Sequence, residues 1–542
     1  MSVEPVPATR PLVRLRADRP EQDWIAPRSL AWVAFVALAS GFVLVAGGNL
    51  DPGEIESRLG LAAGAGLGPF GQVFGGWEPS LWPAQVAPSV LWSWVEGGMP
   101  TTASLRWPSA IAGVLIGLLL VRRASSVLGP RAGVMVGVCL FGSVALIDRS
   151  AGAGLDLIAG LATVAAMDRL LGRGSDLIAG VWTGLAFLAA GWPPVVLIVL
   201  ATVVIGRPES SLSFRLLAPP LAAAAAWSAW ALSVAPAEAW GAALALPLTQ
   251  KSAWIMAVGV VLLGLPWSPF AALAASKSVR EGWSPEGRAL VLGWLQATGA
   301  CLVAGTIVPG LSSSARVPAL AGLAVVAAAC CDRALTGSLS AVARRVFLTL
   351  ALTSAVLWVA LVVVGGTYLA SAVSYYRGVS IVLMVLGMAT FLAGWEAVRK
   401  RDPKLALAAV FAVAVGLKLA HAGYYVPEWN YRRSQGPWGR AIGQWVPPRL
   451  PIYTIHTWPT DLAFAIGRPI RQLPDPKALA FQEADHPQLV LLLDSEFEHW
   501  PKEAPPLIKV AAFQDEHGRG RVLARTEGDF SWRRMAGVAR DE

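Results

Sequence analysis

The sequence carries little charge for its length. Charged residues make up 15% of its 542 residues, whereas soluble globular proteins carry about 25%. Hydrophobic residues make up 55%, and the mean hydropathy is +0.55. Such a chain cannot cover a water-facing surface with polar side chains. The composition therefore predicts an integral membrane protein, and it excludes a disordered chain, a coiled coil and a disulfide-stapled secreted domain.

Cysteine and histidine are also scarce. All cysteines lie inside apolar runs, and all histidines lie in the last quarter of the chain: Cys139, Cys301, Cys330, Cys331, His421, His456, His486, His499 and His517. None of them forms a CxxC motif or a His/Cys cluster with metal-ligand spacing. We expect packing cysteines and neither a zinc nor a redox site, while the sequence leaves open whether a divalent metal takes part.

Thirteen apolar segments predict thirteen membrane-spanning helices. The first, residues 30–47, resembles a signal peptide, but the long tail before it and the apolar continuation favour a retained anchor. The stretch 178–206 is too long for one span and short for two, and Gly191-Trp192-Pro193-Pro194 interrupts it. The other apolar runs are 107–121, 132–147, 155–171, 216–234, 254–275, 289–309, 317–332, 346–366, 379–397 and 404–421.

The distribution of positive charge favours a two-helix hairpin at 178–206. With thirteen spans, 22 lysines and arginines lie in the tail and the inner loops, and six lie in short outer loops: Arg58, Arg106, Arg149, Lys251, Arg316 and Arg377. This is the asymmetry that the positive-inside rule predicts, with the N-terminus in the cytoplasm. The net charge of +9 is thus explained mostly by the lysines and arginines of the inner loops, and it does not imply nucleic-acid binding.

The chain divides into three parts by composition. Residues 1–28 form a basic cytoplasmic tail. Residues 29–421 form the transmembrane part, with an outer loop at 48–103 in which we expect short membrane-surface helices near 54–63 and 84–96. Residues 422–542 predict a small extracytoplasmic α/β domain. Its expected strands are 451–455, 489–493, 508–513 and 521–525, with a helix at 461–466.

Acidic side chains avoid the centres of the apolar runs and gather at their predicted outer ends. They are Asp51, Glu54, Glu56, Glu78, Glu96, Asp148, Asp156 and Glu238. Ionisable groups within a membrane are costly, so their placement indicates function. An ion-coupled transporter needs polar groups near the membrane midplane. The pattern therefore favours a reaction site at the outer membrane–water boundary.

Each candidate residue also has a plain structural interpretation. Asp51-Pro52-Gly53-Glu54 is a turn signal, and an acid is favourable in the first turn of a helix. Asp156 stands where a helix N-cap is expected. Arg106 opens the second span and has the position of a snorkelling interfacial arginine. Glu78 is also explained as a solvated loop acid.

The order of motifs resembles the polyprenyl-phosphate-dependent glycosyltransferases of the GT-C type, in particular the aminoarabinose transferase and protein O-mannosyltransferase relatives. The resemblance covers nearly the whole chain. It rests on an acidic first outer loop, Arg106-x-Pro108-Ser109, Arg149-x6-Asp156, the Gly-Pro break at 191–194, Leu265-Pro266-Trp267-Ser268-Pro269-Phe270, and an outer C-terminal α/β domain containing Pro451-Ile452-Tyr453, Leu462-Ala463-Phe464 and Gly467-Arg468-Pro469.

This resemblance implies an α-helical GT-C-like fold of about thirteen spans in a bacterial-type cytoplasmic membrane. It also implies transfer of a sugar from a polyprenyl-phosphate donor to a lipid, protein or glycan acceptor at the outer face. A carboxylate acts as general base and cations stabilise the leaving phosphate. The implied catalytic residues are Asp51, Glu54 and Asp156, and the implied substrate-binding residues are Glu78, Arg58, Arg106, Arg149 and Arg316.

The sequence departs from the family pattern at several points. Gly53 stands where the family has an aspartate before its glutamate, so Asp51 is expected to act from two positions upstream. Lysines of the family are missing after Glu78 and before Gly191, and the stretch around Arg316 lacks the family's lysine and tyrosine. Arg58, Arg149 and Arg316 are the cations available instead. Two alternatives follow: a non-catalytic relative that binds a lipid-linked glycan or scaffolds an envelope complex and, from span count alone, a transporter or flippase.

Overall fold

The computed structural model describes residues 72–73, 76–77, 87–88, 91–92, 95, 101–144, 155–172, 174–206, 213–234, 254–430, 434–447, 450–455, 460–467, 470–481, 487–514 and 520–527. The basic tail, the predicted first span at 30–47 and the predicted helix near 54–63 lie outside these residues, as does most of the predicted helix near 84–96. Within the first outer loop, β1 (Gln72–Val73) and β2 (Gly76–Trp77) form an antiparallel pair.

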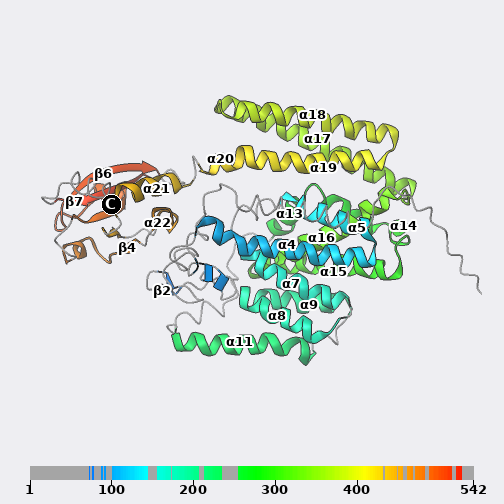
Figure 1. The fold of residues 1–542 in the computed structure, drawn as a ribbon, viewed down its shortest axis with the longest axis horizontal. Coiled ribbons are helices and arrows are strands. Elements are labelled where there is room, and N and C mark those ends of the chain that lie inside the picture. The colour runs from blue at the N-terminus through cyan, green and yellow to red at the C-terminus, as the bar shows by residue number, and fades with distance from the viewer. Residues whose placement is uncertain are drawn as a thin grey trace, which may run out of the picture.

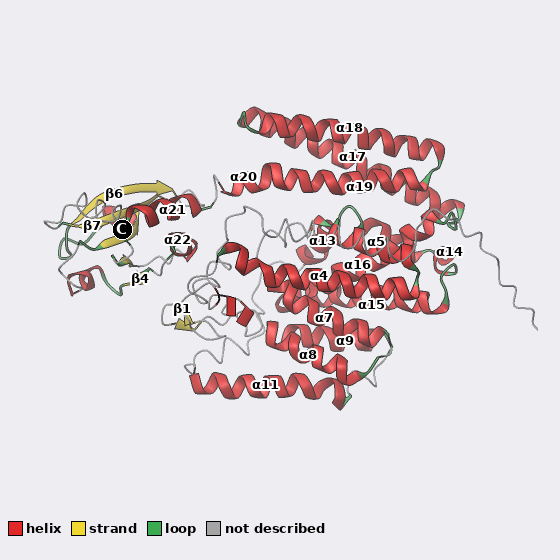
Figure 2. Cartoon of the chain, in the orientation of Figure 1, coloured by secondary structure: helices red, strands yellow, loops and turns green. Residues whose placement is uncertain are grey.

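The chain builds a large helical bundle with a small β-sheet at one end (Figures 1 and 2). The bundle contains α4 (Thr102–Val127), α5 (Pro130–Phe141), α7 (Leu155–Leu171), α8 (Asp176–Ala190), α9 (Trp192–Val204), α11 (Phe214–Val234), α13 (Trp254–Leu263), η1 (Ser268–Ala275), α14 (Lys277–Arg280), α15 (Pro285–Ile307), η2 (Pro309–Leu311), α16 (Ser312–Leu335), α17 (Ala341–Ala372), α18 (Tyr376–Lys400) and α19 (Pro403–Ala420).

Six helices of the described residues are long and apolar enough to cross a membrane, or seven if the bent pair α13 and η1 counts as one span. The stretch 178–206 forms two helices, α8 and α9. The first ends and the second begins at Gly191, whose backbone φ is 71°. Both are shorter than the ~17 residues that a span usually needs. The division predicted from Gly191–Pro194 is therefore present, while the count of thirteen spans stays a prediction.

Large apolar side chains remain exposed along the outward faces of α17 and α18. They include Leu357, Leu361, Val364, Val382 and Val385, each more than half exposed. A soluble protein rarely exposes so continuous an apolar surface. Such exposed apolar faces are typical of helices that contact lipid, as expected for an integral membrane protein.

Helix α16 is the central helix of the bundle. Its most apolar 18-residue window is 94% buried, and it packs against α5, α7, α15 and η1. Its sequence is rich in alanine, which favours a helix and lets neighbouring helices come close. Residues on α16 are therefore held in place by neighbouring helices on several sides.

Glycines allow the closest helix contacts. Gly180 and Gly184 lie one turn apart on α8, and a Cβ built at Gly180 would lie 2.4 Å from the carbonyl oxygen of Arg215 in α11. On α7, a Cβ at Gly160 would lie 2.4 Å from Val317 Cγ1 of α16. Small residues at such crossings are typical of membrane helix packing. The α7–α16 contact is the one that positions the candidate site.

The Leu265–Phe270 motif marks a sharp change of direction. The helix axes on its two sides, 256–263 and 268–275, differ by 105°. Two of its aromatic side chains, Trp267 and Phe270, are fully buried, and Phe270 packs on Phe347 with ring centroids 5.0 Å apart. The segment predicted as one span at 254–275 is thus a broken element anchored in the core.

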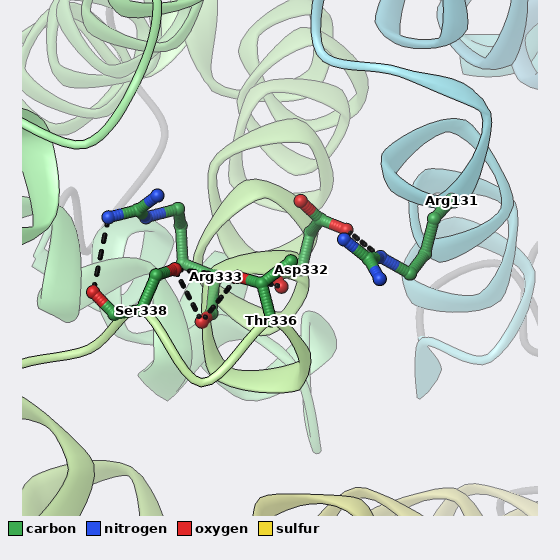
Figure 3. Close-up of polar contacts among 5 residues, drawn as sticks. All are labelled: Arg131, Asp332, Arg333, Thr336 and Ser338. Atoms are coloured by element: carbon green, nitrogen blue, oxygen red, sulfur yellow. Dashed lines mark hydrogen bonds and ion pairs between the residues drawn. The ribbon is translucent and has the colours of Figure 1, made fainter. Parts of the chain in front are cut away.

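Polar contacts fix the last turn of α16 (Figure 3). Arg131, at the start of α5, donates a hydrogen bond to Asp332. Arg333 donates to the carbonyl oxygen of Ser338 at 3.1 Å, and the Thr336 hydroxyl donates to the carbonyl oxygen of Arg333 at 3.0 Å. These contacts lie at the end of the bundle away from the sheet, which we call the far end.

After α19, the π-helical turn η3 (His421–Tyr425) and α20 (Val426–Glu428) lead into the C-terminal α/β unit, residues 436–527. Its elements are α21 (Gly436–Trp445), β3 (Ile452–Thr454), α22 (Thr460–Ile466), β4 (Arg471–Gln472), η5 (Pro476–Phe481), β5 (Leu489–Leu493), α23 (Asp494–Glu498), β6 (Leu507–Gln514) and β7 (Gly520–Thr526). The four strands expected from the sequence and the expected helix are present, and β4 is additional.

The strands of this unit form one five-stranded sheet in the order β4-β3-β5-β7-β6. β4, β3 and β5 are parallel, and β7 is antiparallel to both β5 and β6. Because side chains alternate along a strand, β5 serves two cores. Leu489 and Leu491 belong to the core that includes α21 and α22, while Val490 and Leu492 belong to the core on the opposite face.

The sheet unit touches the bundle at the start of α4. Leu105, which is 1% exposed, belongs to the same apolar cluster as Ile442 of α21 and Leu462 of α22. We call this end of the bundle the sheet end. The contact joins the first described long helix to the last part of the chain, which are far apart in sequence.

Candidate functional site

Three of the eight predicted site residues lie in the described part of the chain. They are Arg106 on α4, Asp156 on α7 and Arg316 on α16. The other five, Asp51, Glu54, Arg58, Glu78 and Arg149, lie outside the described residues. The candidate site in the described residues therefore lies on the three helices α4, α7 and α16.

The three helices run in the same direction. Near their far ends, Arg123 Nε of α4 lies 3.6 Å from Asp168 Oδ1 of α7. In the first halves of α7 and α16, Gly160 lies against Val317. α4 also packs directly on α7 and α16. The beginnings of all three helices therefore lie together at the sheet end, where Leu105 meets the C-terminal unit (Figure 1).

Asp156 and Arg316 lie at nearly the same level on two touching helices. Asp156 is one turn before Gly160 and shares its face of α7, because residues four apart align on a helix. Arg316 directly precedes Val317. At ~1.5 Å of rise per residue, the two residues differ in height by roughly 5 Å. Both side chains are half-buried, so packing places an acid and a cation that are 160 positions apart in sequence at a similar level on neighbouring helices.

Arg106 lies farther toward the sheet. Seventeen residues separate it from Arg123, and twelve separate Asp156 from Asp168, so at ~1.5 Å per residue Arg106 lies roughly 7–8 Å beyond Asp156. Its side chain is only 1% exposed. A charged side chain this deeply buried is costly unless it is paired. Arg106 therefore belongs to the packed junction between bundle and sheet, rather than being a snorkelling interfacial arginine.

Ser109 lies one turn below Arg106 on the same face of α4. It is 2% exposed, and its hydroxyl has no hydrogen-bond partner among the described residues. The sequence placed Ser109 in the Arg106-x-Pro108-Ser109 motif without giving it a role. A buried hydroxyl left unpaired costs about 1–3 kcal/mol, which is a reason to look for a ligand group beside it.

Backbone electrostatics at the sheet end favour an anion. Helix N-termini carry partial positive charge, and α4, α7 and α16 begin at this end, with the Thr101 hydroxyl capping α4 through the Ser104 N–H. Arg106 and Arg316 add two permanent positive charges, and Asp156 adds one carboxylate in the first turn of α7. Such an arrangement is suited to a phosphate group together with a proton acceptor.

A polar and aromatic cluster at the sheet end of α18 and η3 was not predicted from the sequence. The Tyr376 hydroxyl donates to Glu428 Oε2 at 3.3 Å. The rings of His421 and Tyr425 stack with centroids 5.0 Å apart, and Trp429 continues the stack at 6.3 Å. The spacing of four residues between these three aromatic side chains is the signal that predicts such a ladder on a helix.

The described residues contain no group of three or more His, Cys, Asp or Glu side chains that is placed to hold a metal ion. The predicted loop acids, which lie outside the described residues, are not covered by this observation.

Structural comparison finds extensive likeness to solved membrane enzymes. ArnT, an aminoarabinose transferase, from Cupriavidus metallidurans in the apo state aligns with a TM-score of 0.71 at 18% identity, over 92% of this chain and 98% of that chain. The same protein bound to undecaprenyl phosphate aligns with a TM-score of 0.72, at the same identity and coverage. No family model and no curated protein matches the sequence.

This likeness shows the fold. The chain has the GT-C fold, and the alignment covers 92% of its length. The fold expected from the order of sequence motifs is therefore confirmed. At 18% identity, the likeness shows the fold and not the reaction.

Proposed function

We propose that this chain is a membrane glycosyltransferase that moves a sugar from a polyprenyl-phosphate donor to an acceptor at the outer face of a bacterial-type cytoplasmic membrane. The observation that carries the proposal is the full-length GT-C fold shared with ArnT, one structure of which holds undecaprenyl phosphate. The location of Arg106, Asp156 and Arg316 at the same end of three packed helices supports it.

The proposed reaction is a displacement at the anomeric carbon of the donor sugar. An acceptor hydroxyl oxygen forms the new bond to that carbon as the bond to the phosphate oxygen breaks. Polyprenyl phosphate leaves with the bonding electrons, and a carboxylate takes the hydroxyl proton. Asp51 and Glu54 of the first outer loop are the proposed bases, and Asp156 is the further carboxylate assigned to the site.

The cations have a separate role in this proposal. Negative charge grows on the phosphate as the bond breaks, and fixed positive groups stabilise that charge most in the transition state. Arg106 and Arg316 supply such groups beside three helix N-termini, and Arg58 and Arg149 are assigned to the same task from the sequence. Glu78 is assigned to substrate binding, and Ser109 supplies a hydroxyl that lacks a partner among the described residues.

A membrane fold suits this donor because the polyprenyl tail stays in lipid while the phosphate and sugar reach water. The apolar outward faces of α17 and α18 are in keeping with lipid contact. We place the sheet end and the C-terminal unit outside the cytoplasm, as the positive-inside pattern predicts. The acceptor is a lipid, a protein or a glycan with a free hydroxyl.

Transfer of labelled sugar by the purified protein in lipid nanodiscs tests the proposal. A panel of polyprenyl-phosphate sugars serves as donor, and an extract of the cell envelope serves as acceptor. Because a general base contributes roughly 10²–10⁴-fold, we expect a loss of that size when Asp51→Asn and Glu54→Gln are combined. Asp176→Asn, which removes a first-turn acid of α8, is the matched control.

The outcomes separate the parts of the proposal. Transfer that survives the double substitution would show that the base is assigned wrongly while the enzyme remains. Binding of the donors without transfer from any of them would favour a non-catalytic relative that holds a lipid-linked glycan. Flux of donor across the membrane without chemistry would favour a flippase.

A further inference from the structure

A pocket opens in the C-terminal unit at the carboxyl ends of β3 and β5. The chain leaves β3, passes through α22 to β4 on one side, and then returns to β5 on the other side of β3. In open α/β sheets, ligands bind outside the carboxyl ends of parallel strands where the connections diverge in this way. The topology alone therefore indicates this crevice.

The pocket has a volume of about 290 Å³. This is near the lower end of the ~300–1,000 Å³ typical of small-molecule sites, so it suits one compact ring system better than a long chain. Its lining residues are Ile455, Pro476, Leu492, Ser495, Glu496, His499, Trp500 and Pro501. The apolar side chains form most of the wall, and the polar groups come from α23 and the residue after it.

Trp500 is fixed with its indole N–H turned to the protein. Its Nε1 donates to the carbonyl oxygen of Pro505 at 2.9 Å, and the side chain is half-buried. The indole therefore offers an apolar ring surface rather than a donor. Flat apolar surfaces of this kind pack well against the C–H face of a sugar ring.

The polar groups of the pocket are rich in acceptors. His499 Nδ1 lies 2.8 Å from the carbonyl oxygen of Ser495. A carbonyl oxygen only accepts, so in the neutral ring Nδ1 carries the proton and Nε2 is left as an acceptor. The Ser495 hydroxyl adds a further acceptor, and so does the Glu496 carboxylate, whose Oε2 also accepts the backbone N–H of Leu493 at 2.8 Å. A ligand with several hydroxyl donors is the natural complement.

The charge around the pocket disfavours an anionic ligand. Glu496 contributes a carboxylate to the lining. The nearby cation Lys477 is paired with Glu503, with Nζ 2.6 Å from Oε2, and this partner raises the pKa of the lysine. A phosphate or carboxylate in the pocket would therefore meet the negative charge of Glu496, while the cation of Lys477 is already paired.

We propose that this pocket binds a neutral sugar unit. Ile455 and Leu492 belong to the sheet face opposite the one that packs on α21, α22 and Leu105. The pocket therefore faces away from the junction with the bundle and is separate from the proposed reaction site. It is a holding site for a glycan outside the membrane, and its occupancy does not depend on sugar transfer.

Saturation-transfer NMR on the full-length protein in nanodiscs tests this proposal. The probes are the methyl glycosides of glucose, galactose, mannose and N-acetylglucosamine, and no lipid-linked donor is present. We expect saturation transfer to at least one glycoside. Ser495→Phe, at an exposed lining position, is expected to abolish it by filling the pocket. Trp500→Ala is expected to weaken binding roughly three- to tenfold, since an aromatic contact contributes about 0.5–1.5 kcal/mol.

The matched control is Glu498→Phe, which adds the same ring at an exposed position of α23 that does not line the pocket. Its binding is expected to equal that of the unsubstituted protein. Saturation transfer to no glycoside, or transfer that Ser495→Phe leaves unchanged, would overturn the proposal. Binding of inorganic phosphate at this pocket in place of a glycoside would also overturn it. Each result leaves the transfer assay unaffected.

Discussion

Arg316 shows how a single residue acquires meaning from its surroundings. In the sequence it is one of six cations in short outer loops. In the structure it lies half-buried near the start of α16, beside the helix that carries Asp156. Arg106 differs, because its burial makes it part of the bundle–sheet junction as well as a source of positive charge. Substitution of Arg316 is thus the better test of phosphate recognition, because it does not also change the bundle–sheet junction.

Replacing Arg316 with alanine is expected to weaken binding of undecaprenyl phosphate roughly tenfold or more, since a charge-assisted hydrogen bond contributes about 1.5–3 kcal/mol. Arg316→Lys should retain part of the affinity, because it keeps the charge and loses the planar donor pair. Equilibrium binding of labelled undecaprenyl phosphate to protein in nanodiscs measures the effect. Arg377→Ala removes an exposed arginine of α18 and is expected to change nothing. Equal affinity for all variants would remove Arg316 from the site.

At the scale of elements, the site depends on how closely α7 and α16 approach. No side chain at Gly160 separates them, and Val317 occupies the space. At the far end, the Arg131–Asp332 pair holds α16 to α5. The two contacts predict different consequences, because only the first lies near the proposed reaction site.

Gly160→Ala is expected to lower the free energy of unfolding by about 1–3 kcal/mol, because its methyl group overlaps Val317 and forces the helices apart. Gly299→Ala is the matched control. No neighbouring atom lies within 4 Å of a Cβ at Gly299, and the change should raise helix stability by up to ~1 kcal/mol. Thermal unfolding in detergent compares the two variants. A Gly160→Ala protein as stable as the control would contradict the close α7–α16 contact.

Asp332→Asn is expected to lower the free energy of unfolding by ~1–3 kcal/mol. The ion pair between Asp332 and Arg131 is partly buried, so breaking it should cost more than breaking an exposed pair and less than breaking a fully buried one. Undecaprenyl phosphate binding should stay unchanged, because the pair is at the far end. Glu281→Gln breaks an exposed pair with Lys277 and serves as control, with little change expected. Thermal unfolding and undecaprenyl phosphate binding are measured on the same samples. Loss of undecaprenyl phosphate binding in Asp332→Asn protein that is still folded would place the site elsewhere.

At the scale of the whole molecule, the proposed function requires a defined orientation. The sheet end has to lie on the extracytoplasmic side of the membrane, and the far end on the cytoplasmic side. All four cysteines are buried, so introduced cysteines report topology against a low background. Arg377→Cys and Ser495→Cys should react with a membrane-impermeant maleimide in intact cells. Lys277→Cys and Ser338→Cys should react only after the membrane is permeabilised. The reverse pattern would invert the proposed topology.

Much of the molecule was predictable from local sequence, and the parts that were not depend on packing. Apolar runs, the break at Gly191 and the strand at 489–493 are local signals, and the structure has them. β4 is two residues long and leaves no such signal. The similar level of Asp156 and Arg316 on two touching helices arises from the packing of α7 on α16, which joins distant segments of the sequence. The loop acids proposed as bases lie outside the described residues, so their place in the site stays a prediction.

Release of polyprenyl phosphate by the wild-type protein tests the central claim most directly. Labelled polyprenyl-phosphate sugars are incubated with the protein in nanodiscs and an envelope extract, and the freed polyprenyl phosphate is counted per protein molecule. The account predicts many equivalents released per protein, with matching transfer of label to an acceptor. Donor that binds but yields no freed polyprenyl phosphate with any sugar would contradict it.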